Sequence, residues 1–389
     1  MDKLSHLSIE TFLSDYWQKR PVVLRQVFPE FNDIISPEEL AGLALDDDID
    51  SRLIMNSDRG HWNLKQGPLN EQDFHSLADA NWTLLVQSVD HWSQKAENLV
   101  KRFDFIPKWR LDDLMVSYAT TGGGVGPHID QYDVFLIQGS GRRHWQVGEK
   151  DQAVRELSPH PQLKQVAQFE ASIDAVLEIG DVLYIPPNTP HNGVAVDACL
   201  TYSVGFRAPS VQSIFEQLLT GLIERDESIS PRYQDQVLDD PAQLRSAAIP
   251  PHTLPWIKQQ LSTIPDQQLI EAFGQLVTFN NHPLVDEFTT AENITNSEIL
   301  KQTEDNLQSA TSFQLKPASR ACYQVVDTTI LLFVDGNTYQ LPADWLVLLE
   351  DFCQNKPIDV KNAQNLLQHI DLIETLASIN VKGCLLFKQ

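Results

Sequence analysis

The stretch from about residue 82 to residue 206 constrains the fold most, because it is a succession of short β-rich runs separated by Gly, Pro, Asn and Asp. The runs read WTLLVQSV, LMVSYAT, VFLIQG, RHWQVG, AVLEIG, VLYIPP and CLTYSVGF. Closely spaced strands of this kind are typical of an all-β sandwich or barrel. Residues 1–80 are expected to add short helices and irregular segments. One helix is predicted after Ser36, which can form a capping box with Glu39.

The pattern becomes helical after Pro209. The segment VQSIFEQLLTGLIERDE repeats apolar residues at helical spacing, and helices interrupted by prolines are predicted to about residue 280. The segment TTAENITNSEILKQTEDN predicts a linker or a peripheral helix. Further on, TTILLFV, the turn Asp335-Gly336 and NTYQLP predict a hairpin. Helices near 342–354 and 361–379 and a last strand near 382–387 then complete a winged-helix-like module.

The composition excludes several classes of protein. The chain has 389 residues, a net charge of −24 and 42% hydrophobic residues. The acidic excess is shared equally by residues 1–210 and 211–389, so no basic domain could follow a nucleic-acid backbone, and direct nucleic-acid binding is not expected. The longest apolar runs have five residues, and the four cysteines form no CxxC. We therefore expect a cytoplasmic protein with free thiols and no membrane segment.

The sequence holds two His-x-Asp pairs in different contexts. His369-Ile370-Asp371 lies in a helical pattern, where residues two apart point to different faces, so this pair is predicted to be structural. His128-Ile129-Asp130 follows the glycine run GGGVG and precedes the alternating YDVFLIQ. Both side chains of this pair then share one face of a strand and can chelate a metal.

A facial iron site needs a second histidine and leaves three coordination positions open. His191 is the best candidate, because it follows a predicted strand and a proline-rich turn, DVLYIPPNTP, and opens the next strand. In a small antiparallel barrel, that return strand lies close to the strand of His128. His144 in RRHWQV and His160 in a polar loop are weaker candidates.

The motifs GGVGPHID and IPPNTPH resemble those of the jumonji-C (JmjC) family of 2-oxoglutarate-dependent oxygenases. More narrowly, YWQKRPVVLR (16–25), WRLDDLMVSYA (109–119) and HIDQYDVFLIQGSGRRHWQVGEK (128–150) resemble the bacterial ribosomal oxygenases. These enzymes hydroxylate an arginine side chain of large-subunit ribosomal protein sixteen. The resemblance implies an α+β chain, with a double-stranded β-helix (cupin/jumonji-C) barrel in 1–210, a helical dimerisation region in 211–290 and a winged-helix-like domain in 291–389.

The resemblance also implies residue roles. His128, Asp130 and His191 would be the Fe(II) ligands, with 2-oxoglutarate and O₂ as cosubstrates. Arg143 stands where the family places the Lys or Arg that binds the distal carboxylate of 2-oxoglutarate, and a guanidinium can bind a carboxylate through two hydrogen bonds.

Other residues of the same region receive weaker assignments. Ser117 and Thr121 are predicted to donate hydrogen bonds to the cosubstrate from the strand before the glycine run. Arg142 has the opposite strand parity to Arg143 and is expected to face outwards.

The predicted function is Fe(II)- and 2-oxoglutarate-dependent hydroxylation of an arginine in a basic ribosomal protein, which the acidic chain would attract. Histidine hydroxylation or demethylation by the same family, and a non-oxygenase metal-binding cupin, stay open as alternatives. A homodimer is expected through the apolar FEQLLTGLIE face of the helical middle, although that face could instead pack onto the barrel. The winged-helix-like tail is expected to dock proteins.

Overall fold

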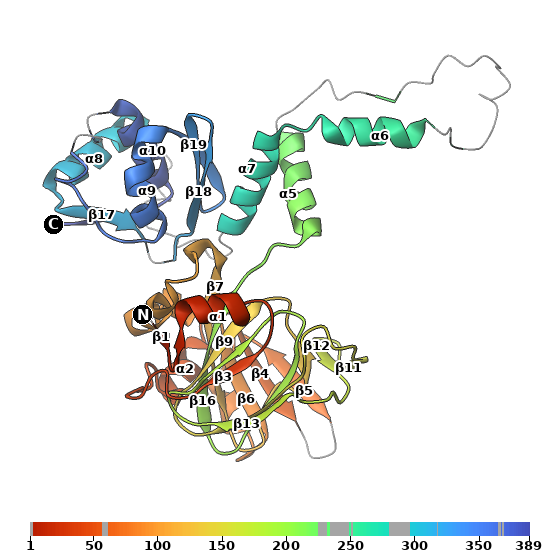
Figure 1. Cartoon of the computed structure of the whole chain (residues 1–389). Helices are drawn as coiled ribbons and strands as arrows, with labels where there is room; N and C mark the ends of the chain where they lie inside the picture. Colours follow the sequence, from red (N-terminus) through yellow and green to blue (C-terminus); the bar gives the residue numbers. More distant parts are fainter. Residues whose placement is uncertain are drawn as a thin grey trace. The chain divides into compact units, whose positions relative to one another are not determined.

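The computed structural model describes residues 3–56, 61–224, 232–233, 249, 252–279, 296–316, 318–364, 367 and 369–389. The chain divides into two compact units, Met1–Ala208 and Pro209–Gln389 (Figure 1). The division falls two residues before the boundary predicted at 210/211, and the boundary predicted at 290/291 lies outside the described residues. Within the described ranges, no helix is long and apolar enough to cross a membrane.

Antiparallel sheets dominate the described part of the first unit. The larger sheet has the strand order β3 (Val22–Leu24), β14 (Val182–Ile185), β9 (Asp133–Gln138), β16 (Cys199–Phe206), β7 (Leu111–Ala119), β6 (Trp82–Val86), β4 (Ser51–Asn56), β5 (Trp62–Gln66). The smaller sheet has the order β13 (Ile173–Leu177), β10 (Arg143–Val147), β15 (Pro190–Ala195), β8 (His128–Ile129). Short hairpins add β1 (Lys3–Leu4), β2 (Leu7–Ser8), β11 (Glu156–His160) and β12 (Leu163–Val166). The strand runs predicted between residues 82 and 206 are confirmed.

Strand β9 is buried on both faces and shows how the sheets are arranged. Val134 and Leu136 pack in one cluster with Trp145 of β10, so this face of β9 meets the smaller sheet. Phe135 and Ile137 join the main core on the other face. Because such a strand has no polar face, its sequence VFLI is continuously apolar. Two facing antiparallel sheets are the arrangement that a double-stranded β-helix requires.

Short helices contribute side chains to the main core of the first unit: α1 (Ile9–Asp15), α2 (Pro37–Leu43) and α4 (Gln94–Val100); α3 (Glu71–His75) lies between β5 and β6 in the chain. The predicted capping box of α2 is confirmed, because Ser36 Oγ accepts the Glu39 N–H at 3.1 Å and Glu39 Oε2 accepts the Ser36 N–H at 2.8 Å. The expectation of only helices and irregular segments in residues 1–80 is wrong. SRLIMN forms β4 because it pairs with both β5 and β6, a tertiary context that the local pattern does not contain.

The second unit contains the helices α5 (Val211–Glu224), α6 (Thr253–Ser262), α7 (Asp266–Thr278), α8 (Asn296–Ser309), α9 (Leu346–Cys353) and α10 (Ile370–Val381). Its strands are β17 (Ser312–Leu315), β18 (Ala321–Val326), β19 (Thr329–Val334), β20 (Asn337–Pro342), β21 (Ile358–Asp359) and β22 (Leu385–Lys388). One apolar cluster joins side chains of α8, α9, α10 and most of these strands into a core.

Two predictions for this unit have different outcomes. The β19–β20 hairpin is confirmed, and Asp335 and Gly336 adopt φ values of 44° and 79°, as a two-residue primed turn requires. The helix predicted near 361–379 begins only at Ile370, because a turn occupies 361–364 and His369 is the residue that precedes the helix. Residues 289–306 were predicted to form either a linker or a peripheral helix. The described part of this segment supports the helix, because it forms α8, whose Thr303 is fully buried.

Candidate metal and cosubstrate site

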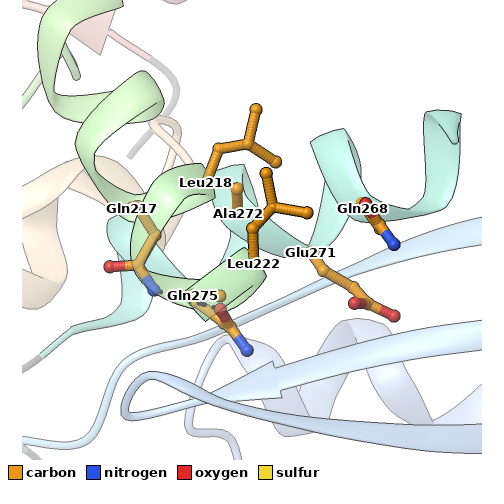
Figure 2. A pocket seen from close by; sticks show the side chains of 8 residues that line it. Gln217, Leu218, Leu222, Gln268, Glu271, Ala272 and Gln275 are labelled. Carbon is orange, nitrogen blue, oxygen red and sulfur yellow. Dashed lines mark hydrogen bonds between the residues drawn. The ribbon is translucent and has the colours of Figure 1, made fainter. Parts of the chain in front are cut away.

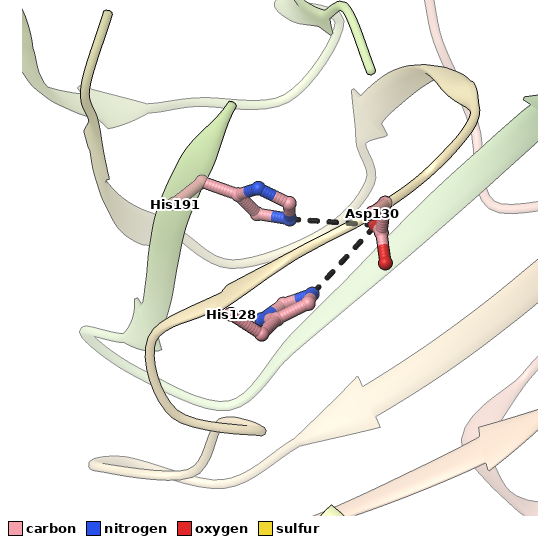
Figure 3. Close-up of side chains that lie close together, drawn as sticks. All are labelled: His128, Asp130 and His191. Atoms are coloured by element: carbon pink, nitrogen blue, oxygen red, sulfur yellow. Dashed lines mark ion pairs between the residues drawn. The ribbon is translucent and has the colours of Figure 1, made fainter. Parts of the chain in front are cut away.

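His128 and His191 lie opposite each other on paired strands of the smaller sheet. His128 opens β8, His191 is the second residue of β15, and the two residues are direct partners in the antiparallel register. Asp130 follows β8 immediately. Figure 3 shows both imidazoles directed towards the Asp130 carboxylate, whose Oδ2 lies 3.7 Å from His128 Nε2 and 3.6 Å from His191 Nε2. The ligand atoms of the three residues lie within 4.8 Å of one another.

The hydrogen bonds of the two histidines define their tautomers. The Nδ1 atom of His128 lies 2.9 Å from the carbonyl oxygen of Gly126, and Nδ1 of His191 lies 2.9 Å from that of Thr189. Because a carbonyl oxygen only accepts, each Nδ1 carries a hydrogen, and in a neutral imidazole the lone pair is then on Nε2, the nitrogen that lies 3.6–3.7 Å from Asp130 Oδ2. Orientation of a ligating imidazole by a backbone carbonyl is common in metal sites.

Burial supports the same protonation state for His191. Its side chain is 3% exposed, and this burial, together with neighbouring His128, lowers the pKa of His191 to about 4. The imidazole is therefore neutral near pH 7. Ligand atoms about 2.1 Å from an ion and at right angles to each other are about 3 Å apart, so small movements bring these three side chains onto one metal. Two imidazoles and one carboxylate fit Fe(II) with open positions.

Arg143 is a buried cation on β10, two strands from β8 in the smaller sheet. Its residue is 5% exposed, and Nη1 donates to Ser117 Oγ and Thr201 Oγ1, both at 3.3 Å. Among the described residues Arg143 forms no ion pair, and its buried Nε has no hydrogen-bond partner. Burial lowers the pKa of Arg143, which expresses the cost of keeping this charge away from water. Such an environment favours an anionic ligand at the guanidinium.

Trp145 and Thr201 are site residues that the sequence analysis missed. The Trp145 ring centroid lies 6.1 Å from that of His191 and 5.7 Å from Cζ of Arg143, and its buried Nε1 has no partner. A Cβ on Gly193 would lie 2.6 Å from this ring, which explains the glycine on β15 two residues after His191. Strand parity could have indicated Trp145, which is two residues after Arg143.

The remaining predicted residues have varied positions. Arg142 is exposed and pairs with Asp197 at 2.9 Å, which confirms that it faces outwards. Ser117 contacts the guanidinium of Arg143, whereas Thr121 lies in the turn after β7 with an exposed side chain. Direct contacts of Ser117 and Thr121 with a cosubstrate stay predictions.

The other histidine candidates do not join the triad. His144 is partly buried and its Nε2 lies 2.6 Å from Asp174 Oδ1, and His160 lies on β11, where its Nδ1 accepts from the Gln162 N–H. His369 precedes α10 and Asp371 lies in its first turn. In the described ranges, His128, Asp130 and His191 form the single group of this kind that could hold a metal ion.

The second unit has a pocket of its own between α5 and α7. It is lined by apolar side chains of Leu218, Leu222 and Ala272 and by polar side chains that include Gln217 and Glu271 (Figure 2). None of the triad residues lines this pocket, so the candidate metal site and the pocket are separate features.

Comparison with known proteins identifies relatives over the whole chain. Residues 98–214 match the JmjC domain family. The ribosomal protein uL16 3-hydroxylase of Escherichia coli K12 is 44% identical over 275 residues, which are 70% of this chain and 72% of that protein.

Solved structures agree with this sequence similarity. The X-ray structure of E. coli YcfD superimposes with a TM-score of 0.84 at 34% identity and covers all of both chains. The structure of YcfD, a ribosomal oxygenase, in complex with cobalt and 2-oxoglutarate gives a TM-score of 0.79 at 34% identity and 99% coverage of both chains. The cupin-type fold expected from the sequence is confirmed.

Proposed function

Because the chain belongs to the JmjC-domain ribosomal oxygenases, we propose that it is an Fe(II)- and 2-oxoglutarate-dependent hydroxylase of an arginine side chain in large-subunit ribosomal protein uL16. The observation that carries the proposal is the triad of His128, Asp130 and His191, with both Nε2 lone pairs facing the same carboxylate. The net charge of −24 suits a basic substrate such as a ribosomal protein.

The triad residues would hold Fe(II) on one face and leave the opposite face for 2-oxoglutarate and O₂. With Fe(II) bound, O₂ would oxidise 2-oxoglutarate to succinate and CO₂, with one oxygen atom going to succinate and the other entering a substrate C–H bond. The protein's part is to hold the ligands in place and to keep water from the site. The carbonyl oxygens of Gly126 and Thr189 fix the two imidazole rings, and burial of His191 limits water on one side.

Arg143 would bind the distal carboxylate of 2-oxoglutarate. Its unpaired Nε and its charge suit a carboxylate, and the hydroxyls of Ser117 and Thr201 hold one end of the guanidinium. The Trp145 N–H, which also has no partner, is a further donor between this cation and His191. The ligand's two ends would thus meet two different cations, the metal at the 2-oxo acid end and the guanidinium at the distal carboxylate, and this fixes its orientation.

Mass spectrometry of uL16 tests this function. The full chain is incubated with purified uL16, Fe(II) and 2-oxoglutarate under air, and a gain of one oxygen atom on an arginine-containing peptide is expected. A gain on a histidine-containing peptide, or loss of a methyl group from lysine, would instead indicate the other reactions of the family. Absence of both product and succinate would favour a metal-binding cupin that is not an oxygenase.

We also propose that the chain forms a homodimer through α5. Val211, Phe215, Leu219 and Ile223 recur every four residues along this helix, and they are 52–78% exposed. An exposed apolar stripe of this length is typical of an interaction surface, since burial of each such side chain is worth about 1.5–3 kcal/mol.

Light scattering with charged variants of α5 tests the dimer. The unsubstituted chain is expected at twice its 44.0 kDa mass, and Leu219→Glu at the mass of one chain, because the new carboxylate would be buried in the interface. Thr220→Glu introduces the same charge at the next exposed position and should remain dimeric. A Leu219→Glu variant with the doubled mass would contradict the assignment of this face.

The C-terminal part of the second unit supports two further proposals. The β19–β20 hairpin and the helices α9 and α10 share one core, and we propose that they form a winged-helix-like domain that docks a protein partner. A ribosomal-protein substrate also leads us to propose a cytoplasmic location.

A further inference from the structure

The loop between β8 and β9 carries Asp130 and is held at its start, middle and end. At its start, His128 pairs with His191 in the smaller sheet. In its middle, the Asn188 N–H donates to the carbonyl oxygen of Asp130 at 2.9 Å. At its end stands Asp133, the first residue of β9 in the larger sheet, which is fully buried. Asp133 is an acid that has no role in the reaction proposed above.

The carboxylate of Asp133 joins several distant segments of the first unit. Its Oδ1 accepts the Tyr184 hydroxyl of β14 at 2.6 Å, and its Oδ2 accepts Gln18 Nε2 and Arg110 Nη2, both at 3.0 Å. Gln18 also donates its backbone N–H to the Tyr184 oxygen at 2.7 Å. The Asp133 carboxylate therefore joins three segments to the end of the loop that carries Asp130. These are the segment after α1, the residue before β7, and strand β14.

Arg110 extends this network to the end of β16, which is the last strand of the larger sheet along the chain. Its Nε donates to the carbonyl oxygen of Arg207, just after β16, and the Arg207 N–H donates back to the Arg110 carbonyl at 2.6 Å. The guanidinium also lies over the Trp17 ring, 5.4 Å from its centroid. The cation that pairs with Asp133 is thus itself held on two sides and gives the loop end a rigid support.

We propose that Asp133 is a positioning residue for the reaction, which sets the place of the Asp130 carboxylate relative to the two imidazoles by fixing the loop end to the larger sheet. A buried acid is costly in a fold unless it is paired and hydrogen-bonded, and the three side chains that donate to Asp133 belong to three different segments around the loop end. The inference rests on the proposed function only in taking Asp130 as a metal ligand.

Asp133→Asn tests this role in the full-length chain. The substitution keeps the size of the side chain but turns one acceptor oxygen into an N–H₂ group among three donors. Calorimetric titration with Co²⁺ is expected to give an affinity about tenfold weaker, the loss typical of groups that orient metal ligands. The visible absorption of the Co²⁺-loaded variant should also change, because the geometry around the ion changes, while thermal unfolding stays cooperative.

Asp33→Asn is the matched control. Asp33 accepts the Tyr202 hydroxyl at 3.0 Å and the Ser140 N–H at 3.1 Å, so it supports the opposite end of β9 with the same chemistry. We expect a lower unfolding temperature for this variant and unchanged Co²⁺ affinity and absorption. If Asp133→Asn does not fold, Tyr184→Phe removes one donor and keeps the ring and the Arg110 pair, and a smaller loss of Co²⁺ affinity is expected.

Two results would overturn the positioning role: an Asp133→Asn variant that binds Co²⁺ like the unsubstituted chain, or an equal loss of affinity in Asp33→Asn. Asp130→Ala separates this failure from failure of the proposed function. If Asp130→Ala keeps its Co²⁺ affinity, the metal site itself is wrong. If Asp130→Ala loses Co²⁺ while Asp133→Asn does not, only the positioning role fails.

Discussion

Asp130→Ala is expected to abolish hydroxylation of uL16 and to weaken Co²⁺ binding by more than about 100-fold, beyond the loss typical of groups that only orient ligands. The substitution removes the one anionic group of the triad and leaves two imidazoles, whose Nε2 atoms lie 3.6–3.7 Å from the lost carboxylate oxygen. Asp130 is only partly exposed, so water replaces the carboxylate poorly. Calorimetry with Co²⁺ and mass spectrometry of uL16 measure the two effects independently.

The control is the second His-x-Asp pair of the same chain. Asp371→Ala removes a carboxylate from the first turn of α10, in the other unit, and should change neither Co²⁺ affinity nor hydroxylation. An Asp130→Ala variant that binds Co²⁺ as tightly as Asp371→Ala would contradict the assignment of the triad.

Arg143→Ala is expected to raise the KM for 2-oxoglutarate about 100-fold, because loss of one partner from a buried charge pair costs about 3 kcal/mol. The side chain is 5% exposed and, among the described residues, its Nε has no hydrogen-bond partner, so this buried donor is free for the distal carboxylate. Co²⁺ affinity without 2-oxoglutarate should stay unchanged, since Arg143 contacts none of the triad residues. Steady-state kinetics and calorimetry separate the two quantities.

Arg142→Ala is the matched comparison, because it removes the same kind of side chain at the residue immediately before β10. Arg142 is exposed and pairs with Asp197, and an exposed pair of this kind contributes about 0–1 kcal/mol. Its loss should leave the KM for 2-oxoglutarate unchanged. Equal values of KM for the two variants would show that the cosubstrate does not use the guanidinium of Arg143.

Strand parity explains why the sequence predicted the centre of the site. His128 and Asp130 share a face because they are two residues apart in strand-like sequence, and parity also separated Arg143 from Arg142. His191 followed from a turn that returns the chain beside His128, and the register now places the two residues opposite each other. The His128–Asp130 pair and the choice of His191 needed only local periodicity and one reversal of the chain, whereas Arg143 was singled out by the resemblance to the JmjC family.

Other features depend on contacts that local patterns do not contain. Strand β4 forms because it pairs with β6, and β5 in turn pairs with β4. Thr201 reaches Arg143 because β16 pairs with β7, where Thr201 lies opposite Ser117. Trp145 followed the correct parity, but a tryptophan in a strand is indistinguishable from core until its N–H is seen to lack a partner. The residues that one strand or one reversal of the chain brings together were predicted. Thr201, which reaches Arg143 through the pairing of β16 with β7, was missed.

The pairing of β8 with β15 has a consequence for the order of events during synthesis. The two histidines that face each other belong to strands separated in the chain by β9 to β14, so a nascent chain exposes His128 long before its opposite residue exists. Until β15 leaves the ribosome, the early half can offer a metal ion two ligands at most. The three ligands are therefore complete only after β15 has been synthesised, and a chain truncated before β15 has no complete site to load.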